Sequence, residues 1–216
     1  MKHPNQSLLT EYAVGTLDKT MRLLVETHLG FCTECESKVK QIRDENLDVT
    51  VTVNDSNSEV PEGMFESILA KISDEKPVIT NSIIPEFLKT EVNEEAKWTW
   101  APMWPAKGKI GTILSDDVSG YSIYLAYFEA GEKAPQHKHL DDEFTVILQG
   151  GYKYGNKHLV VGDWDVAETN STHAPKIDKG EDCWCIVRAK TKKSVAFKGI
   201  DSWRTPFVIW SDFINT

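Results

Sequence analysis

Two groups of histidine, cysteine and carboxylate residues in this sequence have the spacing of metal ligands. The first lies in the stretch THLGFCTECESKV, where His28, Cys32 and Cys35 follow one another at intervals of four and three residues. If one helix continues through them, this spacing places the three side chains on one face near its end. Thiolate sulfur with imidazole nitrogen is the donor set that zinc prefers, but a closed structural zinc site needs a fourth ligand.

His3 is the candidate for that fourth ligand. It is the only other histidine among residues 1–90, and it precedes the first expected helix. An antiparallel hairpin of the first two helices would return the chain close to it. The alternative is a buried core histidine beside two small apolar cysteines. We favour zinc because the histidine stands four residues before a CxxC pair.

The second group lies in the stretch GEKAPQHKHLDDEFTVILQG. On an extended strand His137 and His139 point to the same side, so both imidazoles can face one ion inside a barrel. Glu143 follows an expected turn at LDD and can bring a carboxylate to the same point, and His173 follows a later strand. Three imidazoles and one carboxylate suit zinc, iron, manganese or nickel. The alternative for an HxH pair is a solvated strand edge.

Cys183 and Cys185 form a third pair, two residues apart in the expected strand DCWCIVRAK. Their side chains would face the same way, within a few ångströms of one another. They could form a transient oxidised species, although a disulfide between such neighbours would be strained. Packing in the interior of a barrel explains the pair equally well, and both interpretations stay open.

Length and charge limit the classes of protein that these groups could serve. A chain of 216 residues favours two modest domains, each with its own core. The net charge of −9 argues against direct nucleic-acid binding. The start of the chain has no apolar segment of signal-peptide length, and no run is long enough to span a membrane. We therefore expect a cytoplasmic protein with no membrane contact and with reduced cysteines.

Helical periodicity dominates the first part of the chain, up to about Leu88. Asp18 is the expected N-cap of a helix that runs to about Phe31, KVKQIRDENL continues as a helix, and another helix is expected to start near Pro61. The stretch DVTVTVNDSNSEV is expected to break the helical pattern and form a linker. Residues 1–90 carry nine basic and fifteen acidic side chains, a net charge of −6.

The second part of the chain has the pattern of an all-β domain. Its short apolar and aromatic runs are separated by Gly, Asp and Asn, and the clearest expected strands are YSIYLAYFEAG, EFTVILQGGY, KHLVVGDWDVA and DCWCIVRAK. Such strands favour a closed sandwich or barrel. We predict an α+β multidomain fold: a small helical domain over 1–88, a linker over 89–96 and an antiparallel β-barrel over 97–216.

The stretch from Gly131 to Gly150 resembles the first cupin motif, G(X)5HXH(X)3E(X)6G, and matches it at every defined position. The second cupin motif matches in part: VGD and His173 fit, but Val160 and Ile177 replace the usual proline and asparagine. The resemblance implies a double-stranded β-helix barrel with a bound metal. It says little about an enzymatic reaction.

A helical HxxxCxxC module followed by a single cupin resembles the ChrR-type zinc-binding anti-sigma factors. The resemblance covers nearly the whole chain, from HPNQSLLTEYAVGTL to the CWC pair. It implies Zn²⁺ in the helical domain and Zn²⁺, or iron, manganese or nickel, in the cupin domain. The implied ligands are, for the helical domain, His3, His28, Cys32 and Cys35, and, for the cupin domain, His137, His139, Glu143 and His173.

The resemblance also implies a function in transcription regulation rather than catalysis. The helical domain would bind an extracytoplasmic-function sigma factor, one to one, and keep it from core RNA polymerase. The cupin would act in an oxidative stress response, releasing the sigma factor when singlet oxygen or organic hydroperoxides appear. Independently of the resemblance, an acidic helical domain would be attracted to the basic surfaces of a sigma factor.

Two other functions remain open. The cupin could be a metal-dependent dioxygenase or related oxidoreductase with iron at its four ligands, although its sequence shows no obvious second constellation of acid, base or substrate-binding charge. The helical module could be a DNA-binding zinc domain, which its net charge of −6 opposes.

Overall fold

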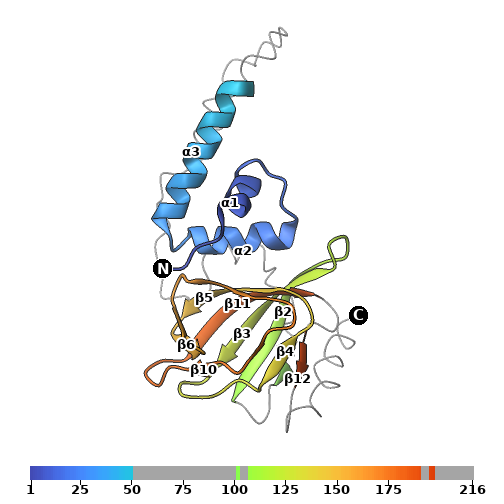
Figure 1. Ribbon diagram of the computed structural model, residues 1–216, viewed down its shortest axis with the longest axis vertical. Coiled ribbons are helices and arrows are strands. Elements are labelled where there is room, and N and C mark those ends of the chain that lie inside the picture. Colours follow the sequence, from blue (N-terminus) through green and yellow to red (C-terminus); the bar gives the residue numbers. More distant parts are fainter. Residues whose placement is uncertain (51–100, 103–106, 191–194, 198–216) are drawn as a thin grey trace, which may run out of the picture.

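Three helices stand on an antiparallel barrel in the computed structural model, which describes residues 1–50, 101–102, 107–190 and 195–197 (Figure 1). The helices are α1 (Gln6–Ala13), α2 (Lys19–Leu29) and α3 (Thr33–Thr50). The helix expected near Pro61 and the linker expected over 89–96 lie outside the described residues.

Side-chain caps start the first two helices. The Asn5 side chain accepts a hydrogen bond from the Leu8 amide at 2.9 Å, and the Asp18 carboxylate accepts from the amides of Thr20 and Met21. The expectation of a cap at Asp18 is therefore confirmed.

The helix boundaries differ from the sequence expectation in two places. α2 ends at Leu29 and α3 begins at Thr33, so no single helix carries the whole HxxxCxxC motif. Cys32 lies in the corner between them, where its sulfur accepts a hydrogen bond from the Cys35 amide at 3.4 Å. α3 also continues through 48–50, where the alternating Val and Thr pattern predicted a break.

Twelve strands are described in the second part of the chain, and every strand pairing between them is antiparallel. They are β1 (Ala101–Pro102), β2 (Gly108–Asp116), β3 (Tyr121–Phe128), β4 (His137–His139), β5 (Glu143–Gln149), β6 (Gly151–Tyr154), β7 (Lys157–Val160), β8 (Trp164–Ala167), β9 (Thr172–His173), β10 (Lys176–Ile177), β11 (Cys183–Lys190) and β12 (Val195–Phe197). The four stretches expected as strands contain β3, β5 with the start of β6, β7 with β8, and β11.

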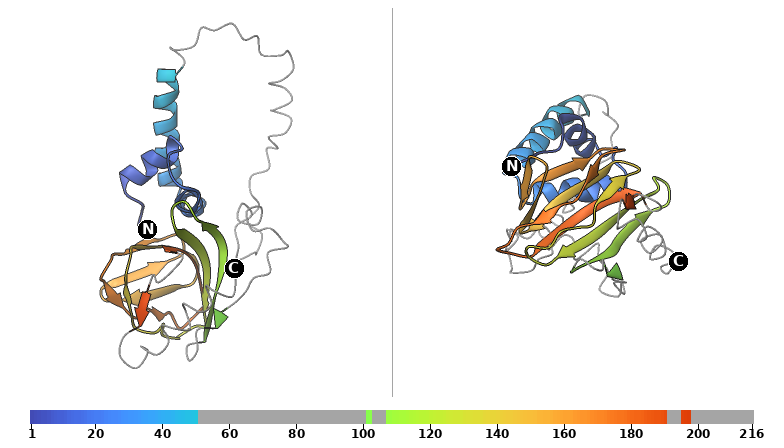
Figure 2. Two further views of the ribbon diagram at one scale, coloured as in Figure 1. Left: turned by 90° about the vertical axis from the view of Figure 1, so that its right-hand side faces the viewer. Right: turned by 60° about the horizontal axis from the view of Figure 1, so that its bottom comes forward.

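The strands form three sheets that curve into a barrel (Figure 2). The largest has the order β1-β2-β3-β11-β5-β8, and two three-stranded sheets have the orders β10-β6-β7 and β12-β4-β9. The interior is filled by one cluster of buried apolar side chains: Ala126, Ile147, Tyr152, Leu159, Ile177, Cys183, Cys185, Val187 and Ala189. Side chains of alternate residues on β3, β5 and β11 face out of the barrel.

The outward-facing side chains of the six-stranded sheet are covered by the helices. α2 contacts β2, β3, β5 and β11. Leu24 and Val25 of α2 are fully buried in the same apolar cluster as Ile123, Val146 and Ile186 of the sheet. The length of the chain predicted a separate core for each half, but the helices described here share a core with the outer face of the barrel.

A partly buried ion pair joins the helices to the barrel beside this shared core. Arg188 of β11 donates from Nη2 to Asp18 Oδ2 at 2.9 Å and from Nε to Thr20 Oγ1 at 2.8 Å. Its guanidinium also lies 3.6 Å from the centroid of the Tyr121 ring. The guanidinium of Arg188 thus links the N-terminus of α2 to β11 and packs on Tyr121 of β3.

Among the described residues, no helix combines the length and apolar character needed to cross a membrane.

Candidate metal centres

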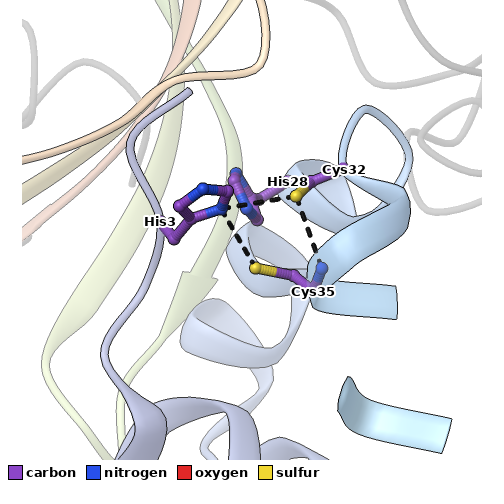
Figure 3. Close-up of side chains that lie close together, drawn as sticks. All are labelled: His3, His28, Cys32 and Cys35. Carbon is purple, nitrogen blue, oxygen red and sulfur yellow. Dashed lines mark hydrogen bonds between the residues drawn. The ribbon is translucent and has the colours of Figure 1, made fainter. Parts of the chain in front are cut away.

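The N-terminal cluster brings together His3, His28, Cys32 and Cys35 (Figure 3). His3 precedes α1, His28 lies in the last turn of α2, Cys32 in the corner, and Cys35 in the first turn of α3. One ligand atom from each residue lies within 4.8 Å of the others. Nδ1 of His3 lies 3.4 Å from the Cys32 sulfur and 3.3 Å from the Cys35 sulfur.

His28 has the hydrogen bonding expected of a metal ligand. It is fully buried, and its Nδ1 lies 2.8 Å from the carbonyl oxygen of Gly162. A carbonyl can only accept, so Nδ1 carries the proton. The other nitrogen, Nε2, is buried and has no hydrogen-bond partner among the described residues. Such an orphaned lone pair beside two thiols fits a cation.

The pKa values of Cys35 and His28 also fit a bound cation. Burial, together with the neighbouring Cys32, raises the pKa of the Cys35 thiol to about 12. Burial also lowers the pKa of His28, so the imidazole is neutral at neutral pH. A divalent cation would stabilise the thiolates that burial alone disfavours, and two thiolates with two imidazoles are a zinc donor set.

The barrel cluster brings together His137, His139 and His173. The first two lie at the ends of β4, and His173 lies on β9 directly opposite His137 in the antiparallel register. Nε2 of His173 lies 2.9 Å from Nε2 of His137 and 2.9 Å from Nε2 of His139. Residues two apart on a strand face the same side, so His137 and His139 lie side by side. The pairing of β4 with β9 brings His173 next to them.

These imidazoles are neutral. Burial lowers the pKa of His139 to about 4 and of His173 to about 3, and it also lowers the pKa of His137. Nδ1 of His137 lies 2.8 Å from the carbonyl oxygen of Pro135, so it donates and leaves Nε2 unprotonated. Three neutral imidazoles with converging Nε2 atoms fit a divalent metal ion.

Glu143 lies beside this cluster rather than among its three Nε2 atoms. Its Oε2 is 3.8 Å from Nδ1 of His139, at the start of β5. Burial, reinforced by Asp165, raises the pKa of the Glu143 carboxyl to about 7. Burial disfavours the ionised form of this carboxyl group, and a nearby cation would stabilise that form. Glu143 therefore remains a predicted fourth ligand.

A second polar group in the barrel was missed by the sequence. Tyr154 of β6 contacts the His173 ring edge-on at 4.5 Å between centroids, and its hydroxyl donates to Asp165 of β8. Lys157 of β7 donates to Asp165 Oδ1 at 2.8 Å and to the Tyr154 hydroxyl at 2.8 Å. The sequence showed no obvious second constellation of acid and base, and the structure brings one together from β6, β7 and β8. The sequence signal that could have revealed this group is Asp165, a carboxylate at a buried position of an apolar strand. A buried carboxylate needs a hydrogen-bonded or cationic partner.

Cys183 and Cys185 are both buried thiols that face the barrel interior from β11. A hydrogen bond with Cys183 and burial raise the pKa of Cys185 far above its ordinary value. A thiol held in this way reacts slowly, because the thiolate is the nucleophile. Their packing explains their position, and a redox role stays a prediction.

Comparison with known proteins agrees with this architecture. Residues 89–193 match the family described as the ChrR cupin-like domain. Anti-sigma-E factor ChrR of Cereibacter sphaeroides is 25% identical over 187 residues, which covers 85% of this chain and 87% of that protein. The crystal structure of Rhodobacter sphaeroides SigE in complex with the anti-sigma ChrR matches with a TM-score of 0.65 and 23% identity, covering 87% of this chain and 98% of that chain.

The sequence similarity extends through both parts of the chain, and the structural similarity extends through helices and barrel alike. Residues 89–193 thus match the ChrR cupin-like domain, and the chain resembles the ChrR-type anti-sigma factors along most of its length.

Proposed function

We propose that this protein is an anti-sigma factor that binds an extracytoplasmic-function sigma factor in the cytoplasm and keeps it from core RNA polymerase. One observation carries the proposal: the chain is similar to an anti-sigma factor over 85% of its length. The cluster of His3, His28, Cys32 and Cys35 in the helical part agrees with it. A solved relative is described in complex with the sigma factor SigE, which supports a sigma factor as the partner here.

The helical part supplies the surface for that partner. α2 is covered by the barrel, whereas α3 extends away from it, as both figures of the whole chain show. Glu34, Glu36, Asp44 and Glu45 of α3 are exposed. Sigma factors present basic surfaces to DNA and polymerase, so an acidic helix would attract one and compete for those surfaces.

The N-terminal cluster would hold Zn²⁺ as a structural ion. Its four residues tie the N-terminus, α2 and α3 together at one point. Because a metal site that exists only in the folded chain adds its binding free energy to folding, zinc would fix the helices in the arrangement that binds the sigma factor.

The barrel would act as the sensor of the oxidative signal, singlet oxygen or an organic hydroperoxide. The cluster of His137, His139 and His173, with Glu143 as fourth ligand, would hold Zn²⁺, iron, manganese or nickel. The domain limits of 1–88 and 97–216 belong to the same proposal.

Co-purification tests the proposal. The chain is expressed with a candidate extracytoplasmic-function sigma factor, and the complex is weighed and its metals counted. We expect a one-to-one complex that is lost in the double variant His28→Ala, Cys32→Ser and kept in His158→Ala, which removes an exposed histidine. A double variant that still folds and still binds the sigma factor would contradict the role given to zinc.

A second candidate function is a metal-dependent dioxygenase or related oxidoreductase. The Tyr154, Asp165 and Lys157 group beside His173 favours it, because it places an acid and a hydroxyl next to a possible metal site. Oxygen consumption by the iron-loaded protein with thiol or small organic substrates, abolished by His137→Ala, would favour this function. Oxygen consumption no faster than that of free iron would contradict this second function and leave the anti-sigma function as the single candidate.

A further inference from the structure

We propose that the barrel completes the N-terminal metal site: the β7–β8 turn, residues 160–164, holds two of the four ligands in place, so that barrel docking and metal binding strengthen one another. The inference rests on the zinc site proposed at His3, His28, Cys32 and Cys35. In this proposal the barrel supplies none of the four metal ligands, but its turn positions two of them, His3 and His28.

The first contact sets the orientation of His28. The acceptor for its Nδ1 proton is the carbonyl oxygen of Gly162, 134 residues away in the sequence, at 2.8 Å. Hydrogen bonds of this kind fix the tautomer and the ring plane of a metal-binding histidine. Since Nε2 of His28 has no other partner among the described residues, the barrel carbonyl determines where that lone pair points.

The second set of contacts positions His3. The residue before it, Lys2, donates its backbone amide to Asp163 Oδ1 at 2.7 Å, and its carbonyl oxygen accepts from the Trp164 amide at 3.0 Å. The Lys2 ammonium also donates to the His158 carbonyl oxygen at 3.1 Å. Since no helix includes residues 1–5, these bonds to the barrel are what fix the backbone next to His3.

Asp163 is prepared for this role by its own turn. The side chain is buried, and its second oxygen, Oδ2, accepts from the Val160 amide at 3.1 Å. The carboxylate therefore bridges the turn and the N-terminal segment. A buried carboxylate that accepts two backbone amides is satisfied only while the N-terminal segment is docked.

The turn is also shaped to approach the helical part closely. Gly162 has a φ of +82°, and an added Cβ would come within 2.8 Å of Met1 Cε and 2.8 Å of Phe31 Cβ. Any other residue would be strained in this backbone conformation and would push the turn away from the helices. The Trp164 ring lies edge-on to His28 with 6.1 Å between centroids.

One short strand connects this turn with the barrel cluster. Trp164 faces the N-terminal site, and the next residue, Asp165, accepts the hydroxyl of Tyr154, whose ring contacts His173. A change at the barrel cluster that moves β8 would therefore shift the contacts to His28 and His3. By linkage, metal bound at the N-terminal site would in turn stabilise the docked turn.

Cobalt binding by the full-length chain measures the effect on the N-terminal site alone. Thiolate-to-cobalt charge transfer reports that site, because the barrel cluster contains no cysteine. Gly162→Ala should lower the affinity for Co²⁺ at this site by about 10- to 100-fold, the usual effect of losing a partner of a metal ligand. The matched control is Gly120→Ala, which has a similar φ of +72° but no atom within 4 Å of the added Cβ. The control should retain the parent affinity.

A second pair of variants leaves every barrel residue unchanged. Lys2→Pro removes the amide that donates to Asp163, whereas Lys2→Ala keeps that amide and removes only the ammonium. We expect weaker cobalt binding in Lys2→Pro and near-parent binding in Lys2→Ala. This pair decides the question if Gly162→Ala does not fold.

Amide hydrogen exchange tests the reverse direction in Cys32→Ser, Cys35→Ser. The Trp164 amide, which donates to Lys2, should exchange faster than in the metal-loaded parent. The Gly162 amide, which donates to Ile147 within the barrel at 2.9 Å, should not change.

The outcomes separate the two proposals. If the parent chain shows no thiolate charge transfer with cobalt, the proposed metal site is wrong. If the parent shows it, and Gly162→Ala and Lys2→Pro bind cobalt as tightly as their controls, the site stands and the role given to the barrel turn is overturned.

Discussion

At the scale of single residues, both clusters use the same arrangement to prepare an imidazole for a metal. In His28 and in His137, Nδ1 donates to a backbone carbonyl, of Gly162 and Pro135 respectively. The tautomer is thereby fixed with its lone pair on Nε2. A ligand prepared in this way loses little rotational freedom on binding metal.

Metal analysis tests the two clusters separately. The protein should bind two metal ions per chain. Cys32→Ser, Cys35→Ser should remove one, and His137→Ala, His173→Ala the other, because the clusters share no residue. His158→Ala, an exposed histidine, should keep both. A cysteine variant that retains two ions would show that the N-terminal cluster is not a metal site.

The hydroxyl of Tyr154 is predicted to contribute to stability. Tyr154→Phe removes the hydrogen bond to the Asp165 carboxylate and the bond that Lys157 donates to the hydroxyl, but leaves the bond from Lys157 to Asp165 in place. We expect a loss of about 1 to 2 kcal/mol in the free energy of unfolding, measured by urea denaturation. Tyr12→Phe is the control, since its hydroxyl donates to a partly exposed carboxylate on α2 and should matter less. Equal effects would argue against a structural role for the buried network.

Spacing predicted which of the histidines and cysteines that are close in sequence come together, whereas His3 and His173 were predicted from the expected hairpin of helices and from a later strand. His28, Cys32 and Cys35 are close in sequence, and HxH on a strand needs no tertiary information. Gly162, Asp163 and Tyr154 could not be found in this way, because their contacts depend on how β7 and β8 lie against the helices and against β6. Local periodicity carries no information on such contacts.

At the scale of elements, the N-terminus of α2 has a double role. Asp18 caps the helix through the amides of Thr20 and Met21, and the same carboxylate pairs with Arg188 of β11. The cap was visible in the sequence, but the ion pair was not, because it joins residues 170 positions apart.

Two substitutions of Asp18 separate these roles. Asp18→Asn keeps a capping side chain but leaves Arg188 unpaired, whereas Asp18→Ala loses both. We expect a loss of about 2 kcal/mol in the free energy of unfolding for Asn. This is less than the roughly 3–5 kcal/mol of a fully buried pair, because the Asp18 side chain is 29% exposed. Alanine should cost about 1 kcal/mol more. Equal losses measured by urea denaturation would contradict this division.

The same carboxylate predicts a pH dependence. Burial alone would raise the pKa of Asp18, but hydrogen bonds from Thr20 and Met21 and the charge of Arg188 lower it below the ordinary 3.8. The stability that it contributes is therefore present above 3.8 and is lost as the pH falls through the folded-state pKa. The difference in unfolding free energy between the parent and Asp18→Asn should shrink below pH 3.8. A difference that stays constant to lower pH would contradict the shifted pKa.

The strands were predicted better than the helix ends. Apolar runs bounded by Gly, Asp and Asn located β3, β5, β7, β8 and β11. The helical periodicity of residues 19–50 did not predict the corner between α2 and α3, because the apolar face of the chain continues through it. The local signal of this helix end was Gly30, which is the C-cap of α2.

At the scale of the whole molecule, the described helices and the barrel form one packed body with two candidate metal clusters. One lies where the helices meet the β7–β8 turn, and the other lies on β4 and β9. The shared core joins Leu24 and Val25 of α2 to the outer face of β3, β5 and β11. This packing explains how a signal received in the barrel could reach the helices that we propose bind the sigma factor.

Charge should govern the rate of that binding. Residues 1–90 carry a net charge of −6, so association with a basic sigma factor should slow as salt screens the attraction. Stopped-flow association rates should fall by about tenfold or more between low and high salt, with little change in the dissociation rate. Glu36→Gln, Glu45→Gln should lower the low-salt rate, whereas the equally exposed pair Gln41→Ala, Ser37→Ala should not. An association rate that does not depend on salt would contradict a role for charge in sigma factor binding.

The most direct test of the anti-sigma function is transcription in a purified system. Core RNA polymerase and the sigma factor that co-purifies with this chain are combined on a promoter that depends on that sigma factor. The zinc-loaded protein, added in equal amount to the sigma factor, should abolish the transcript, and Cys32→Ser, Cys35→Ser should not. Full transcription in the presence of excess zinc-loaded protein would contradict the proposed function.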